Sequence, residues 1–128
     1  MSAASLRARY MGDAVTTASP QRLLVMLYDR LALDLERAQA AFAAGDRTEA
    51  NLQLQHAQDI VLELRSSLQV DAWESGPRLA ALYSWLLGEL VQANVKADRN
   101  HVASCLQVVE PLRDAWRQAA ASLSTAPA

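Results

Sequence analysis

The sequence predicts an all-α protein that folds as an antiparallel four-helix bundle, preceded by a short N-terminal segment that is helical or extended. A chain of 128 residues suits one domain with one core. Ala and Leu, both strong helix formers, supply much of its 52% hydrophobic content, while Gly and Pro are few. Four stretches repeat apolar residues at three- and four-residue steps, no stretch shows the alternation of a strand, and the joins are short.

The chain divides into three parts. Residues 1–18 lack sustained periodicity, so we expect a mobile arm or a short cap helix, in which Leu6, Tyr10 and Met11 would share one side. We assign the four-helix bundle to residues 19–123 and expect a disordered tail at 124–128.

The first helix of the bundle should begin at Ser19-Pro20, because Ser accepts a hydrogen bond from the first-turn amides and Pro suits the position after the cap. Gly45 should end it. Its apolar stripe contains Leu23, Leu24, Leu27, Tyr28, Leu31, Leu35, Ala38 and Phe42.

The second helix should follow Asp46, which has Glu49 three residues later, as in a capping box. We expect it to run to about Val70. Its apolar stripe contains Leu52, Leu54, Ala57, Ile60, Val61, Leu64 and Leu68.

The third helix should begin after Ser75-Gly76-Pro77, a combination that breaks one helix and starts another. We expect it to end near Lys96. Its apolar residues are Leu79, Leu82, Tyr83, Leu86, Leu87, Leu90 and Ala93.

The fourth helix should start with Asp98 or Asn100 as its cap and end before Pro127. Val102, Leu106, Val109, Leu112 and Trp116 are its core candidates. Pro111 lies inside it and removes one backbone hydrogen bond, so we expect either a kink or two shorter helices.

Charge and composition exclude several functions. The 12 basic and 14 acidic residues give a net charge of −2 without a long basic block, which makes nucleic acid an improbable partner. No segment approaches the ~18 apolar residues that span a bilayer. We therefore expect a cytoplasmic protein without membrane insertion.

The sequence contains no pattern that predicts catalysis or a cofactor. It has no phosphate-binding glycine loop, no nucleophile motif and no carboxylate pair at a suitable spacing, so an enzyme with a small-molecule substrate is improbable. His56 and His101 are read as surface residues, and no metal site is expected. The single cysteine, Cys105, should pack as a small apolar side chain.

The apolar stripes are wider than a narrow core seam requires. Three adjacent pairs widen them, namely Leu23-Leu24, Leu86-Leu87 and Val108-Val109. Two interpretations of these pairs stay open: plain core, or an exposed groove between helices that binds an amphipathic helix of a partner.

Particular strings resemble a known family. They are ARYMGDAVTTASPQRLLVMLYDRLALDLERAQAA, HAQDIVLELRSSLQ, LYSWLLGELVQANVKAD and VVEPLRDAW, between about Arg9 and Ala120. Together they resemble the FliS-type flagellin export chaperones.

The resemblance implies a cytosolic bundle that binds the disordered C-terminal region of flagellin, prevents premature polymerisation and delivers flagellin to the flagellar type III export gate. It implies no cofactor. It also implies that Tyr10 caps an apolar groove in the free chaperone, with help from Leu6 and Met11. The further client-binding candidates are Leu24, Leu27, Ile60, Leu64, Leu68, Tyr83, Leu87 and Asn94, although Asn94 also suits a structural role at the turn before the last helix.

A second function remains open from the residues themselves. A generic four-helix interaction module, or a structural protein that closes its apolar stripes against a second copy, would show the same periodicity. Binding of a flagellin C-terminal peptide distinguishes the two.

Overall fold

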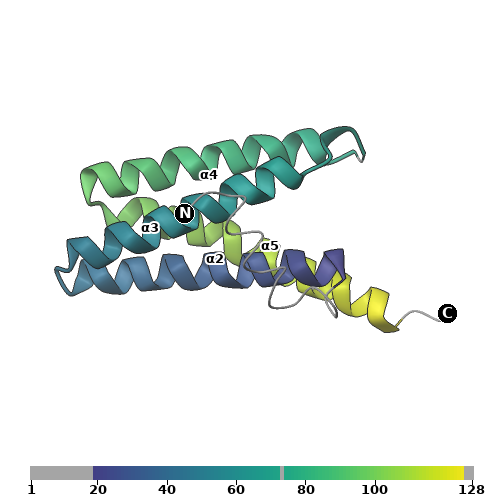
Figure 1. Cartoon of the computed structure of the whole chain (residues 1–128), viewed down its shortest axis with the longest axis horizontal. Helices are drawn as coiled ribbons and strands as arrows, with labels where there is room; N and C mark the ends of the chain where they lie inside the picture. The colour runs from purple at the N-terminus through teal and green to yellow at the C-terminus, as the bar shows by residue number, and fades with distance from the viewer. Residues whose placement is uncertain (1–18, 73, 126–128) are drawn as a thin grey trace.

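The described part of the chain forms four long helices, each of which packs against two others in a bundle. A computed structural model describes residues 19–72 and 74–125, with the backbone alone for 123–125. The helices are α2 (Pro20–Ala43), α3 (Arg47–Ser67), α4 (Gly76–Lys96) and α5 (Arg99–Thr125), and a short 3₁₀ turn, η1 (Val70–Ala72), lies between α3 and α4. Helix α2 packs against α3 and α5, and α4 packs against the same two. The all-helical bundle is therefore confirmed (Figure 1).

The residues at the helix ends explain why the helices start and stop where they do. The Ser19 side chain accepts a hydrogen bond from the Arg22 amide, and Pro20 follows it, as the sequence predicts. The Asp46 carboxylate accepts from the Glu49 amide at 3.0 Å. Between these helices Gly45 has φ +73°, and Ala97 takes a left-handed conformation between α4 and α5 with φ 50°.

Two details of the second predicted helix are wrong. Helix α3 ends at Ser67 rather than near Val70, because the chain turns into η1. Leu52, expected in the buried stripe, is 58% exposed. It lies two residues from both Ala50 and Leu54, which are buried, and a step of two residues turns a helix by more than half a circle.

Helix α5 is continuous through Pro111, so the alternative of two shorter helices is wrong. Proline has no amide hydrogen, and the Gln107 carbonyl therefore lacks its usual donor from residue 111. Both residues are exposed, so water can bond to this carbonyl.

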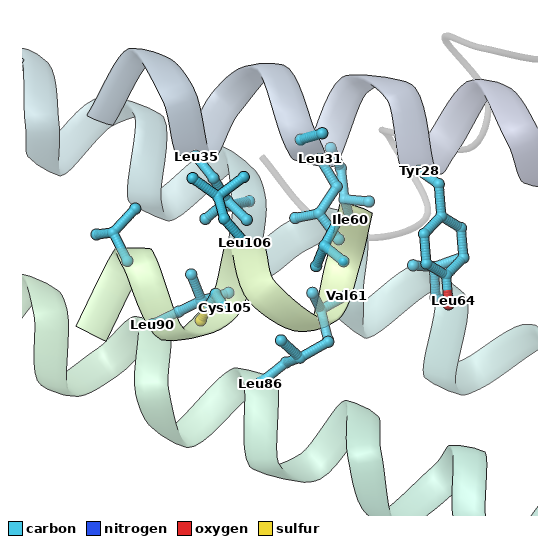
Figure 2. Close-up of a cluster of buried hydrophobic side chains, with 14 of the residues drawn as sticks. Tyr28, Leu31, Leu35, Ile60, Val61, Leu64, Leu86, Leu90, Cys105 and Leu106 are labelled. Carbon is cyan, nitrogen blue, oxygen red and sulfur yellow. The ribbon is translucent and has the colours of Figure 1, made fainter. Parts of the chain in front are cut away.

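The core lies where all four helices meet. It includes Leu31 and Leu35 of α2, Ile60 of α3, Leu90 of α4 and Val109 of α5, all fully buried. Figure 2 shows Leu31, Leu35, Ile60 and Leu90 in this core, with Cys105 beside Leu90 and Leu106. Complete burial of each of these side chains stabilises the bundle by roughly 1.5–3 kcal/mol.

Candidate functional site

The bundle opens at one end. In Figure 1, α3 and α4 run away from α2 and α5 towards the end where α2 begins and α5 finishes. Burial follows this divergence, since the first buried residue of α2 is Leu27 and the last of α5 is Val109, among the residues whose side chains the structure describes.

An apolar groove of about 510 Å³ lies at the open end, between the first half of α4 and the second half of α5. Its walls are mainly leucine, alanine and tryptophan, with one hydroxyl and one guanidinium. The lining residues are Ser75, Arg78, Leu79, Leu82, Leu112, Ala115, Trp116 and Ala119. We call this the α4–α5 groove.

A pair of tyrosines lies where the closed core meets the groove. The hydroxyls of Tyr28 and Tyr83 are 2.7 Å apart and link α2 to α4 across the bundle. Trp116 of the groove wall packs on Tyr28, with ring centroids 6.3 Å apart and planes tilted by 52°. The pair therefore satisfies two polar groups in the core and supports the wall of the groove.

The tyrosine hydroxyls stay protonated over a wide pH range. Burial raises the pKa of Tyr28, and hydrogen bonds with Tyr83 and Trp116 offset part of this effect. The pKa of Tyr83 rises further, because burial is reinforced by the charge and hydrogen bond of Tyr28. The pair therefore acts as a neutral structural link rather than an acid or base.

A second groove, also about 510 Å³, lies on the opposite side of the last turns of α5, against the start of α2. Its lining is more polar and includes an ion pair in which Arg117 donates to Asp29 at 2.6 Å. The other lining residues are Ser19, Arg22, Val25, Met26, Ala120 and Ala121.

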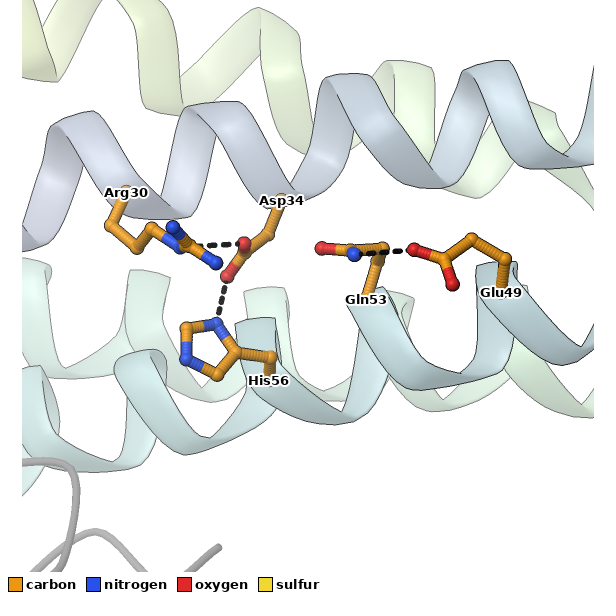
Figure 3. Close-up of polar contacts among 5 residues, drawn as sticks. All are labelled: Arg30, Asp34, Glu49, Gln53 and His56. Carbon is orange, nitrogen blue, oxygen red and sulfur yellow. Dashed lines mark hydrogen bonds and ion pairs between the residues drawn. The ribbon is translucent and has the colours of Figure 1, made fainter.

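A buried polar cluster joins α2 to α3. The Asp34 carboxylate accepts from Arg30 at 3.0 Å and bonds to the His56 ring nitrogen Nδ1 (Figure 3). Gln53 donates to Glu49 one turn away. Burial raises the pKa of Asp34, while His56 and Arg30 pull it down less strongly. The bond between Asp34 and His56 links α2 to α3.

The prediction that both histidines are solvated surface residues is wrong. His56 is mostly buried against Asp34, and His101 bonds to Glu89 at 2.7 Å, linking α5 to α4. Periodicity could not reveal these contacts, because Asp34 and Glu89 each lie on a different helix from the histidine that they bond to. Within residues 19–72 and 74–125, no group of three His, Cys, Asp or Glu is placed to hold a metal ion.

Cys105 is fully buried in the core, as the sequence predicts. Burial, helped by the nearby charge of Glu89, raises the pKa of its thiol to about 12. The thiol therefore packs and does not act as a nucleophile.

The structure describes eight of the eleven predicted client-binding residues. Leu6, Tyr10 and Met11 lie outside the described residues. Four candidates are buried in the core: Leu27, Ile60, Leu64 and Tyr83. Leu24, Leu68 and Leu87 are partly buried against that core, and Asn94 donates to Asn51 of α3 at 2.6 Å. None of these eight described candidates lines either groove, so their contact with a client stays a prediction.

Sequence reasoning missed the residues that line the α4–α5 groove as a set. Leu79, Leu82, Leu112 and Trp116 were assigned to the apolar stripes that form the core. A signal was available in Ala115 and Ala119, four residues apart on one side of α5, because small side chains leave room beside a helix. Periodicity alone does not show where along a helix the apolar stripe lacks a neighbouring helix to cover it.

None of the helices in the described part of the chain is long and apolar enough to cross a bilayer. Of the three adjacent pairs that widen the apolar stripes, Leu86 and Val109 are buried in the core, and none of the six residues lines the α4–α5 groove.

Comparison with known proteins gives a consistent result. Residues 2–123 match the family described as flagellar protein FliS. The flagellar secretion chaperone FliS of Bacillus subtilis is 34% identical over 110 residues, which cover 86% of this chain and 82% of the relative. The protein of the same name in Escherichia coli is 32% identical over 114 residues, covering 88% and 84%.

A solved structure, described as a flagellar chaperone from bacteria, has the same fold. It superposes with a TM-score of 0.75 and covers 92% of this chain and 97% of its own. The two sequences share 20% identity, so this likeness concerns the arrangement of the helices.

Proposed function

The chain belongs to the FliS family of flagellar proteins, and from this premise we propose that it is a cytoplasmic chaperone that binds the C-terminal region of flagellin. The client would remain bound until it reaches the flagellar export gate. While bound, it would be unable to polymerise.

The α4–α5 groove is the observation that carries this proposal. Leucine and tryptophan side chains line it, and it is open along one side of the bundle. An amphipathic helix buries apolar residues at positions i, i+3, i+4 and i+7 in a groove of this kind. A client segment that is disordered when free gains helix there and loses its exposed apolar surface.

The proposal requires binding alone. It assigns no catalytic step, cofactor, nucleic acid or small-molecule substrate to the chain. The N-terminal residues Leu6, Tyr10 and Met11 are proposed to compete with the client for the apolar surface, as the family resemblance implies. Binding of flagellin would then displace this segment and expose it to the export machinery.

A peptide of the flagellin C-terminal region tests the proposal by calorimetry and circular dichroism. We expect one peptide per chain and a gain of helical signal. Leu82→Asp places a charge in the groove and should weaken binding at least about tenfold, because a buried unpaired carboxylate is costly.

Val95→Asp is the matched control. Val95 is 69% exposed near the end of α4 that lies away from the groove, so the same new charge there should leave binding within about twofold. Absence of binding by the unaltered protein would contradict the proposal. Sedimentation as a dimer, with the groove variant monomeric, would favour a homodimer instead.

A further inference from the structure

One positively charged side chain, that of Arg78, lines the α4–α5 groove. Of the eight residues that line it, Arg78 is the charged one, and the other seven are apolar or small. Arg78 lies at the end of the groove near the start of α4, one turn from Leu82 on the same side of that helix. The apolar α4–α5 groove therefore has a positive charge at one end.

Arg78 differs from Arg117, which lines the second groove. Arg117 donates to Asp29 at 2.6 Å. Arg78 is exposed, and no carboxylate within residues 19–72 and 74–125 lies within ion-pairing distance of its guanidinium. Its charge is therefore available to an incoming ligand.

The position of Arg78 is also unfavourable for the helix. The first turn of α4 contains no acidic residue, and a cation there is repelled by the positive end of the helix dipole. A ligand carboxylate at this point would be attracted both by the guanidinium and by the helix end.

We propose that Arg78 is a specificity residue, which selects client segments that carry a carboxylate beside the apolar residues filling the α4–α5 groove. This inference rests on the proposed function. Because Arg78 and Leu82 are four residues apart, the client's Asp or Glu should lie three or four residues from the apolar side chain that contacts Leu82.

The probe is a C-terminal peptide of the flagellin made by the same cell, together with versions in which each Asp or Glu is replaced in turn by Asn or Gln. Arg78→Gln should weaken binding of the unaltered peptide about threefold, and Arg78→Glu about tenfold, because an exposed pair contributes modestly and a reversed charge repels. Arg78→Glu places an acid in the first turn of α4, which favours the helix, so reduced binding would not reflect unfolding.

Arg99→Glu is the control for net charge. Arg99 is exposed in the first turn of α5, at the opposite end of α4 from the groove, and should bind the peptide within about twofold of the unaltered protein. One peptide carboxylate should show coupling to Arg78: once it is neutralised, Arg78→Gln should have no further effect. A Lys at that peptide position should restore binding to Arg78→Glu.

Three results are possible, and each decides something. Coupling of Arg78 to one peptide carboxylate supports the inference. Equal effects of Arg78→Glu and Arg99→Glu, with the unaltered protein still binding, overturn it and leave the proposed function standing. Failure of the unaltered protein to bind any flagellin peptide overturns both.

Discussion

The two ends of the bundle are built from similar residues but differ in what covers them. At the closed end, Leu35, Leu54, Leu90 and Val102 come from four different helices, and each is fully buried. At the open end, Leu82, Leu112 and Trp116 are also apolar, yet they remain partly exposed in the α4–α5 groove. Apolar side chains therefore stabilise the fold at one end and remain partly exposed at the other, and the Tyr28–Tyr83 pair marks the border.

The largest expected contrast between the ends is in thiol reactivity. Cys105 lies in the closed end, and its pKa of about 12 against an ordinary value of 9.0 reduces its thiolate about a thousandfold near pH 8. Native protein should therefore react with a disulfide reagent at least about a thousand times more slowly than unfolded protein. A cysteine introduced by Leu82→Cys, with Cys105→Ala, should react quickly. Similar rates for both thiols would contradict the division into closed and open ends.

Truncation of a leucine separates the ends by stability. Leu35→Ala leaves a cavity among four helices and should lower the free energy of unfolding by about 3 kcal/mol. Leu112→Ala, in the groove wall, should cost about 1 kcal/mol but weaken client binding. Urea unfolding gives both values, and calorimetry gives the affinity. If the two truncations cost the same, Leu112 belongs to the core.

The tyrosine pair at the border should contribute less than a core leucine. Tyr28→Phe leaves the buried Tyr83 hydroxyl without its partner, and Tyr83→Phe leaves the Tyr28 hydroxyl with Trp116 alone, so each should cost about 1–2 kcal/mol. The double variant should cost less than the sum of the two. Both folded-state pKa values are raised, so this stability is present below pH 10 and is lost as pH rises through them. Alkaline unfolding that does not change in the double variant would refute the pair's role.

The smallest effect concerns Asp34, in the polar cluster between α2 and α3. Its folded-state pKa is raised above 3.8 because burial disfavours the carboxylate. The contribution of this group to stability is therefore complete below pH 3.8 and declines as pH rises through the folded-state pKa. The difference in unfolding free energy between the unaltered protein and Asp34→Asn should fall over this window. A difference that rises with pH would mean that Arg30 and His56 outweigh burial.

Much of the fold could be predicted from local sequence. Ser19, Asp46 and Gly45 set helix ends through bonds within a few residues, and they act as expected. The apolar stripes also identify most of the core, because a helix in a bundle must bury one face. Leu52 was placed wrongly, since it follows the spacing of the stripe but falls beside it.

The groove could not be predicted in the same way. Leu82 and Leu112 have the spacing of core residues, and the divergence of α4 from the second half of α5 leaves them partly exposed in the groove. The same limit applies to His56, whose partner Asp34 is 22 residues away on another helix. Contacts between helices depend on their relative register and rotation, which the periodicity of one helix does not predict.

The proline within α5 has a mechanical consequence. The backbone hydrogen bond between residues 107 and 111 is missing, because Pro111 has no amide hydrogen. This point lies directly before the stretch of α5 that forms a wall of the groove. Bending at this point is opposed by one backbone hydrogen bond fewer than bending elsewhere in α5. We therefore expect clients of different size to be fitted into the groove by a small bend of α5 at Pro111.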